Sequence, residues 1–169
     1  MQIYFMRHGL AADKKLPIYL NNDAERPLTE EGIKKSIIVA KGLKKIVKNF
    51  DIIFTSPLKR ALQTASIVAE EFNLKTKIKV INELLPGTNQ DDFIKLLINL
   101  KEFKKVLFVG HEPDLSEKLS NLLNTDPKIF KLKKSCVCRI DIKIMQNKIK
   151  SKIIWIIQPS QFKALRRKK

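Results

Sequence analysis

Residues 2–9 read Gln-Ile-Tyr-Phe-Met-Arg-His-Gly, a short apolar run followed directly by Arg7, His8 and Gly9. An apolar run of this length that ends in polar residues is typical of a strand buried on both faces. The same design recurs at residues 105–110, Lys-Val-Leu-Phe-Val-Gly, which are followed by His111. We therefore predict two buried strands that each end beside a histidine, and the chain has no other histidine.

Further strands and helices alternate between and after these two segments. Apolar periodicity predicts helices at 30–48, 57–72, 90–100 and 113–123, with Thr29 as the N-cap of the first. Strands are expected at 51–56 and 77–81, and residues 136–144 and 149–157 form a predicted hairpin. Residues 10–28 lack periodicity and are expected to be loop. This alternation predicts an α/β fold: a helix-flanked, mainly parallel sheet with a C-terminal antiparallel hairpin.

The length favours one domain. The chain has 169 residues and a mass of 19.5 kDa, and a single domain commonly holds about 100–150 residues. Its longest apolar runs are only a few residues, whereas a membrane span needs about 20. No secretory signal is visible at the N-terminus. We expect one cytoplasmic domain over residues 1–169, with a basic tail at 160–169 and no membrane partner.

The charge is strongly positive, with 34 Lys+Arg against 17 Asp+Glu, a formal net charge of +17. The excess comes from 28 lysines, and only six residues are arginine. Nucleic-acid readout relies on arginine forks and stacking aromatic rings, and no such stripe is present. We therefore interpret most of the charge as a lysine-coated surface and do not expect a nucleic-acid partner, although a charge suited to an anionic partner remains the alternative.

The chemistry-bearing residues gather where the predicted strands end. In open α/β sheets, ligands bind beyond the carboxyl ends of the strands, so His8 and His111 can face one crevice. Arg7 precedes His8, and Arg60 lies early in the helix after the second strand. Arginine forks match phosphate oxygens, so these residues indicate a site for a dianion. Glu83 follows the third strand and is a candidate general acid.

Several other chemistries lack their motifs. The sequence contains no phosphate-binding loop, no dinucleotide fingerprint and no Gly-x-Ser-x-Gly elbow. Histidines with metal-ligand spacing are missing too, and Cys136 and Cys138 make a poor zinc site. Without a sequence signal for a metal or an activated serine or cysteine, histidine is the best nucleophile available. We expect no metal and no cofactor.

Five ordered motifs match a family. Arg7-His8-Gly9 after the first strand resembles the signature of the histidine phosphatase superfamily, which has the phosphoglycerate-mutase-like fold. The others recur in the expected order: Arg26-Pro-Leu-Thr29-Glu-Glu-Gly32, Thr55-Ser-Pro-Leu-Lys-Arg60-Ala-Leu-Gln-Thr64-Ala65, Asn82-Glu83-Leu84 and Val109-Gly-His111-Glu-Pro113. The resemblance covers roughly residues 1–157, and the compact size looks most like the SixA-type phosphohistidine phosphatases.

This resemblance implies a mechanism. His8 would attack phosphorus and become transiently phosphorylated, after which water releases inorganic phosphate. Arg7, Arg60 and His111 would hold the phosphoryl oxygens and stabilise charge in the transition state. Glu83 matches the approximate position of the acid in larger members of the superfamily. The substrate-binding set adds two further residues, Gly9 and Arg26.

The spacing of the motifs bears on the substrate. Only 22 residues separate Arg60 from Glu83, which leaves no room for the insertion that caps the site in mutases and sugar phosphatases. An open site suits phosphohistidine on a protein such as a phosphotransfer domain. Two alternatives remain: a small-molecule phosphomonoesterase of the same superfamily, and a basic module that binds nucleic acid or another anion. The joint presence of both histidines and both arginines speaks against the second alternative.

Overall fold

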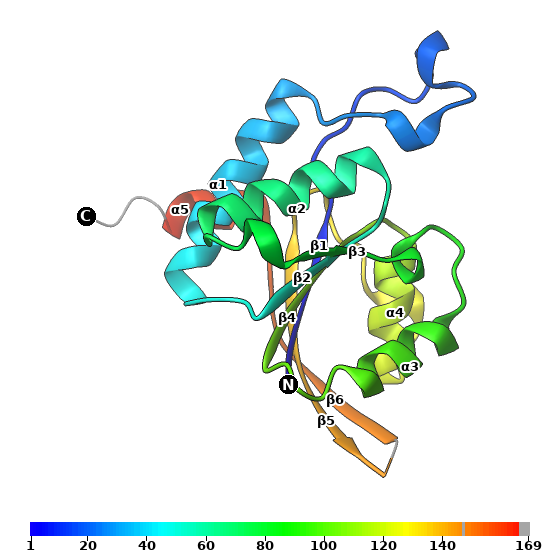
Figure 1. The fold of residues 1–169 in the computed structure, drawn as a ribbon, viewed down its shortest axis with the longest axis vertical. Coiled ribbons are helices and arrows are strands. Elements are labelled where there is room, and N and C mark those ends of the chain that lie inside the picture. The colour runs from blue at the N-terminus through cyan, green and yellow to red at the C-terminus, as the bar shows by residue number, and fades with distance from the viewer. Residues whose placement is uncertain (147, 166–169) are drawn as a thin grey trace.

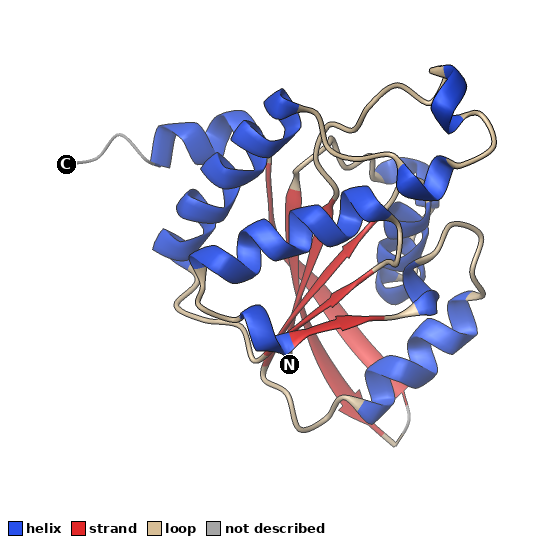
Figure 2. Cartoon of the chain, turned by 45° about the horizontal axis from the view of Figure 1, so that its top comes forward, coloured by secondary structure: helices blue, strands red, loops and turns tan. Residues whose placement is uncertain are grey.

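A computed structural model describes residues 1–146 and 148–165, which form one six-stranded sheet between two layers of helices (Figures 1 and 2). The strands are β1 (Gln2–Arg7), β2 (Ile52–Thr55), β3 (Ile78–Val80), β4 (Lys105–Gly110), β5 (Val137–Met145) and β6 (Lys148–Ile157). The α-helices are α1 (Glu30–Ile46), α2 (Lys59–Glu71), α3 (Gln90–Asn99), α4 (Asp114–Leu123) and α5 (Pro159–Leu165).

The sheet has the strand order β3-β2-β4-β1-β5-β6. Neighbours from β3 to β1 pair in parallel, whereas β5 is antiparallel to β1 and β6 is antiparallel to β5. The expected fold class is therefore confirmed. In this order β1 and β4 lie side by side, and Arg7 stands opposite Gly110. The two predicted histidine-bearing strand ends are thus neighbours.

The apolar runs of the central strands are continuous because both faces of the sheet are covered. On one face, Tyr4 and Met6 of β1 pack with side chains of α1, α2 and α5. On the other face, Ile3 and Phe5 pack with side chains of α3 and α4. Complete burial of such a side chain stabilises the fold by about 1.5–3 kcal/mol. Packing on both faces therefore fixes the central strand from which the site residues extend.

The two edge strands differ from the central ones. Lys79 is exposed on β3, and Lys148, Lys150 and Lys152 are exposed on β6. The alternation of lysine and apolar residues at 77–81 predicted a one-sided edge strand, and β3 is indeed an edge of the sheet. Both edges thus carry lysine side chains that point to solvent.

Two expectations at element ends need correction. α2 begins at Lys59 rather than at residue 57, and Leu58 is its N-cap. The basic tail expected at 160–169 is wrong for residues 160–165, which belong to α5. Phe162 is fully buried and packs closely over Gly42, so apolar burial outweighs the charge of this segment. The rest of the expected tail, residues 166–169, lies outside the described residues.

No helix in the described ranges has the length and apolar character needed to cross a membrane.

Candidate active site

The two histidines meet where β1 and β4 end. The His8 backbone N–H donates to the Gly110 carbonyl at 3.0 Å, which continues the parallel ladder by one residue. The two rings have their centroids 5.0 Å apart, and His8 and His111 are only 7% and 2% exposed. The neighbouring strand ends therefore bring together the pair of imidazoles that the sequence indicated.

A single hydrogen bond assigns the tautomer of His8. Its Nδ1 lies 2.7 Å from the carbonyl oxygen of Gly9. A carbonyl only accepts, so Nδ1 carries the proton and Nε2 presents a lone pair. The Gly9 N–H donates to Thr64 Oγ1 at 3.0 Å. Both backbone polar groups of Gly9 are thus used inside the protein, so Gly9 holds His8 in place and offers no free backbone group to a ligand.

Both imidazoles are held in the neutral form. The pKa of His8 is lowered to about 3, first by burial and further by the positive charges of Arg60 and Arg7. The pKa of His111 is also lowered to about 3, first by burial and then by His8 and Arg60. Near neutral pH, Nε2 of His8 is therefore available as a nucleophile.

Ser56 orients the second imidazole. Its Oγ lies 2.8 Å from Nε2 of His111 and accepts a hydrogen bond from the Leu58 N–H at 3.3 Å. When the Ser56 hydroxyl donates to Nε2, Nδ1 of His111 carries the ring proton. That Nδ1 is buried without a partner among the described residues. The geometry supplies a donor that a bound anion could use.

Arg7 brings a guanidinium to the same place. Its Nη1 donates to the Leu132 carbonyl at 2.8 Å, and its Nε is buried with no partner among the described residues. Burial lowers the pKa of Arg7, and the charge of Glu112 raises it in part. The guanidinium nonetheless stays charged at neutral pH, and one backbone carbonyl fixes its orientation.

Arg60 is held by an acid that the sequence did not single out. Its Nη1 and Nη2 donate to the backbone carbonyl and to Oδ2 of Asp23, both at 2.8 Å. The other carboxylate oxygen of Asp23 accepts from Nε of Arg26 at 2.7 Å. Arg60 is 4% exposed, whereas the Asp23 side chain is 51% exposed. Asp23 therefore bridges the two arginines from an exposed loop, and no sequence pattern around it announced this role.

Glu83, the expected general acid, is carried by the short turn that follows β3. It lies in a short 3-10 turn, Asn82–Leu84, and lines a separate depression together with Thr88 and Asp92. Among the described residues, its carboxylate forms no hydrogen bond or ion pair with His8 or His111. Because β3 is parallel to β1 and β4, its end places Glu83 at the edge of the sheet where the two histidines also lie.

Glu112 is the acid that does lie close to the group. It directly follows His111, and its Oε1 accepts from Ser116 Oγ at 2.8 Å and from the Leu132 N–H at 3.0 Å. Burial raises its pKa. The Leu132 N–H donates to Glu112, and the Leu132 carbonyl accepts from Arg7. The backbone of this one residue therefore holds both side chains in place. The sequence contained Glu112 in the Gly-His-Glu-Pro motif, but its burial could not be read there.

The group as a whole is suited to an oxyanion. Guanidinium and imidazole donors stabilise negative charge on a phosphoryl group, and a neutral imidazole nitrogen is a competent nucleophile. Within residues 1–146 and 148–165, no set of three or more His, Cys, Asp or Glu side chains is arranged to hold a metal ion.

The chain is similar to several known proteins. A family model described as histidine phosphatase superfamily (branch 1) matches residues 3–84. The phosphohistidine phosphatase SixA of Escherichia coli is 36% identical over 116 residues, which are 67% of this chain and 68% of the relative. An uncharacterized protein of Picosynechococcus is 38% identical over 119 residues, 69% and 70% of the two chains. The solved structure of the protein histidine phosphatase SixA complexed with tungstate has a TM-score of 0.80 at 26% identity, with 95% of this chain and 98% of that chain covered.

Proposed function

This chain belongs to the histidine phosphatase superfamily, and we propose that it is a phosphohistidine phosphatase that acts on proteins. The observation that carries the proposal is the His8 tautomer: the Gly9 carbonyl holds the Nδ1 proton and leaves Nε2 as a buried lone pair beside His111. A nucleophile of this kind accepts a phosphoryl group without first losing a proton.

The proposed reaction has two steps. In the first, Nε2 of His8 forms a bond to phosphorus as the P–N bond of the substrate breaks, and the leaving imidazole takes a proton from solvent. In the second, water attacks phospho-His8, the new P–N bond breaks, and inorganic phosphate leaves. His8 returns to its starting tautomer because the Gly9 carbonyl still holds the Nδ1 proton.

Arg7, Arg60 and His111 are proposed to bind the phosphoryl oxygens. Arg7 and Arg60 each have a buried Nε without a partner in the described part of the chain, and His111 has such an Nδ1. Donors fixed before the reaction stabilise charge in the transition state at little reorganisation cost. Arg26 would act through Asp23, which it shares with Arg60.

Two observations support a protein substrate. The curated relative from Escherichia coli is named for phosphohistidine. In addition, between α2 and the 3-10 turn that carries Glu83 the chain forms only β3 and one further short turn, so this segment places no cap over the site. A phosphorylated histidine on a protein surface, such as that of a phosphotransfer domain, could therefore approach His8.

The chemistry of phosphohistidine also fits the position of Glu83. Imidazole is a better leaving group than an alkoxide, so the reaction needs less help from a general acid.

We also propose that the reaction needs no metal, because two guanidinium groups supply positive charge at the site. Chelator-treated and untreated protein should then have equal activity, and a loss restored by a divalent cation would contradict this point.

Trapping the intermediate tests the proposal. The protein is mixed with a ³²P-labelled phosphohistidine protein or with a panel of labelled phosphate esters, and quenched in base, which preserves phosphohistidine. Label is expected on His8 with the phosphoprotein as donor. His8→Ala should take up none and lose activity by about 10³-fold or more. Equal activity of His8→Ala would overturn the nucleophile, and faster labelling by a small ester would favour the phosphomonoesterase alternative.

A further inference from the structure

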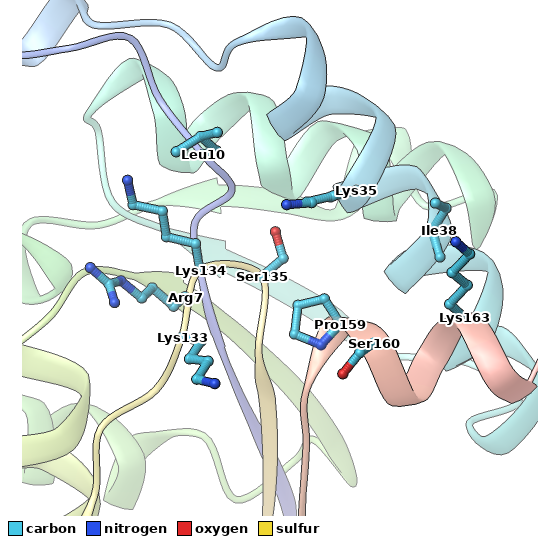
Figure 3. Close-up of a pocket in the computed structure, with 10 residues that line it drawn as sticks. All are labelled: Arg7, Leu10, Lys35, Ile38, Lys133, Lys134, Ser135, Pro159, Ser160 and Lys163. Carbon is cyan, nitrogen blue, oxygen red and sulfur yellow. The ribbon is translucent and has the colours of Figure 1, made fainter.

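A cavity of about 600 Å³ lies beside the candidate active site and shares Arg7 with it (Figure 3). Its walls come from four separate parts of the chain: residues 7–10 at the end of β1, the N-terminal half of α1, residues 133–135 just before β5, and α5. Apart from Arg7, none of its lining residues takes part in the proposed reaction. The cavity therefore needs a separate explanation.

Half of the side chains that line the cavity are cationic, and none is acidic. We call it the basic cavity after these cations: Arg7, Lys35, Lys133, Lys134 and Lys163. Figure 3 shows them spread around the cavity from Arg7 at one end to Lys163 at the other. Lys35 is paired with Glu31 at 2.5 Å, whereas the other three lysines form no ion pair with a described residue. Such a gathering of positive charge attracts an anionic ligand.

Two of these lysines are fixed relative to the nucleophile. Ser135 adopts a left-handed conformation, with φ of 60°. Its N–H lies 3.1 Å from the Arg7 carbonyl and 3.2 Å from the His8 carbonyl. The Cys136 N–H donates to the Lys133 carbonyl at 2.9 Å. The backbone of Lys133 and Lys134 is thus tied to the strand end that carries His8.

The charge of the basic cavity is continuous with that of the phosphoryl site. The pKa of Lys134 is lowered, first by burial and then by the positive charges of Arg7, Arg26 and Arg60. Lys134 in turn lowers the pKa of His8. Lys134 directly precedes Ser135, whose N–H lies against the Arg7 and His8 carbonyls, so its charge belongs to the same strand end as the reacting groups. A substrate with a second negative group beside its phosphoryl group would therefore bind better than one without it.

The remaining lining residues indicate what kind of anion fits. Leu10, Ile38 and Pro159 give the cavity apolar surface between its charges. Glutamate and aspartate side chains combine an aliphatic stem with a carboxylate, which suits a cavity with apolar walls and cations around it. A second phosphate on a small metabolite has no such stem and would leave the apolar surface uncovered. The lining thus favours polypeptide carboxylates.

We infer that the basic cavity binds aspartate or glutamate side chains that flank the phosphohistidine of the substrate protein. This inference rests on the proposed function and narrows its substrate class to acidic polypeptide segments. The phosphoryl group would lie at His8, and the neighbouring carboxylates would lie against Lys133, Lys134 and Lys163. Binding would then depend on the residues around the phosphohistidine as well as on the phosphoryl group.

The test compares two phosphohistidine peptides of equal length, one with glutamate and one with glutamine at the flanking positions, and phosphoramidate as a small substrate. Lys133→Gln/Lys163→Gln removes two charges from the basic cavity. Lys101→Gln/Lys143→Gln removes two exposed charges outside it and is the matched control. The cavity variant should lose about fivefold in kcat/KM on the glutamate peptide. It should keep the wild-type rate on the other two substrates, and the control should keep all three rates.

The outcomes separate the two proposals. Equal turnover of both peptides by the wild-type protein, or equal losses in the cavity variant and its control, would overturn the cavity assignment and leave the proposed function intact. Hydrolysis of phosphoramidate with no turnover of either peptide would overturn the protein substrate, and the cavity assignment with it. A phosphate-free glutamate peptide gives a second readout: it should inhibit the wild-type protein competitively and the cavity variant about fivefold more weakly.

Discussion

The candidate site is built from two unlike regions. The strand-end region comprises Arg7, the last residue of β1, together with His8 and His111, which follow β1 and β4. The loop region comprises residues 10–28, which include Asp23 and Arg26. The histidines of the first are buried and held by backbone hydrogen bonds, whereas the second projects beyond the sheet (Figure 1) and exposes apolar side chains such as Ile18 at 73%. The reacting histidine and its neighbours are thus placed by the sheet, whereas the loop supplies the counter-charge of Arg60, which stands on α2.

The largest expected effect lies in the strand-end region. His111→Ala should lower kcat on phosphohistidine by about 10²- to 10³-fold, because a donor to the transition state is lost. Ser56→Ala leaves the imidazole but removes its 2.8 Å contact, and should cost only about tenfold. Steady-state kinetics on both variants checks the ranking. A larger loss in Ser56→Ala than in His111→Ala would mean that Ser56 itself contacts the substrate.

The histidine pair should also make stability depend on pH. The pKa of His8 and of His111 falls from 6.5 to about 3 on folding, so the unfolded chain binds more protons between these values. The contribution of the two neutral histidines to the free energy of unfolding is therefore expected to be complete above pH 6.5. It should fall as the pH drops towards about 3. Urea unfolding across this pH window measures the slope of the free energy of unfolding against pH. This slope should be smaller for His8→Gln than for the wild-type protein, by up to about 1.4 kcal/mol per pH unit. An unchanged slope would contradict the buried neutral state.

The junction between the two regions gives a smaller effect. A Cβ on Gly32 would lie 2.0 Å from the Leu10 carbonyl oxygen, which also accepts a hydrogen bond from the Thr29 N–H. Gly32→Ala must therefore displace the start of the loop or of α1, and should destabilise the fold by about 1–3 kcal/mol despite the higher helix propensity of alanine. Lys34→Ala, exposed on the same helix, is the control and should stay within about 0.5 kcal/mol. Urea denaturation compares the two.

The smallest effect belongs to the loop region. Arg60 and Arg26 outweigh burial and lower the pKa of Asp23, so its carboxylate is ionised and competes with phosphate for Arg60. Asp23→Asn should bind inorganic phosphate about two- to fivefold more tightly, a modest gain because the Asp23 carboxylate is half exposed. Calorimetric titration with phosphate measures it. Weaker binding would instead show that Asp23 holds Arg60 in its working position.

The strand-end region could largely be predicted from the sequence, whereas the contacts of the loop region could not. The apolar runs ending at His8 and His111 predicted two buried parallel strands, and parallel neighbours bring their carboxyl ends to one edge of the sheet. Thr29 was predicted as an N-cap, and its side chain accepts from the Gly32 N–H at 3.0 Å. These features depend on local periodicity and on hydrogen bonds between near neighbours, which the order of residues encodes directly.

The features that escaped prediction depend on contacts across long separations. Asp23 meets Arg60 across 37 positions, and Ser56 meets His111 across 55. Glu83 was expected at the site because it follows a strand; it lies in a 3-10 turn and lines a depression with residues of α3. The basic cavity joins α1, residues 133–135 and α5, of which the last was expected to be tail. Net charge alone did not indicate where unpaired lysines would gather.

The lysines on the two sheet edges have a consequence for crowded conditions. An exposed strand edge is a template on which a second molecule can add its own strand. If β3 or β6 of two molecules paired, their backbones would lie about 5 Å apart, the usual spacing of paired strands, and lysine side chains on the two edges would be brought close together. Lys79 on one edge and Lys148, Lys150 and Lys152 on the other would then repel their counterparts. The sheet can therefore end at six strands, with no further element needed to block growth into a fibre.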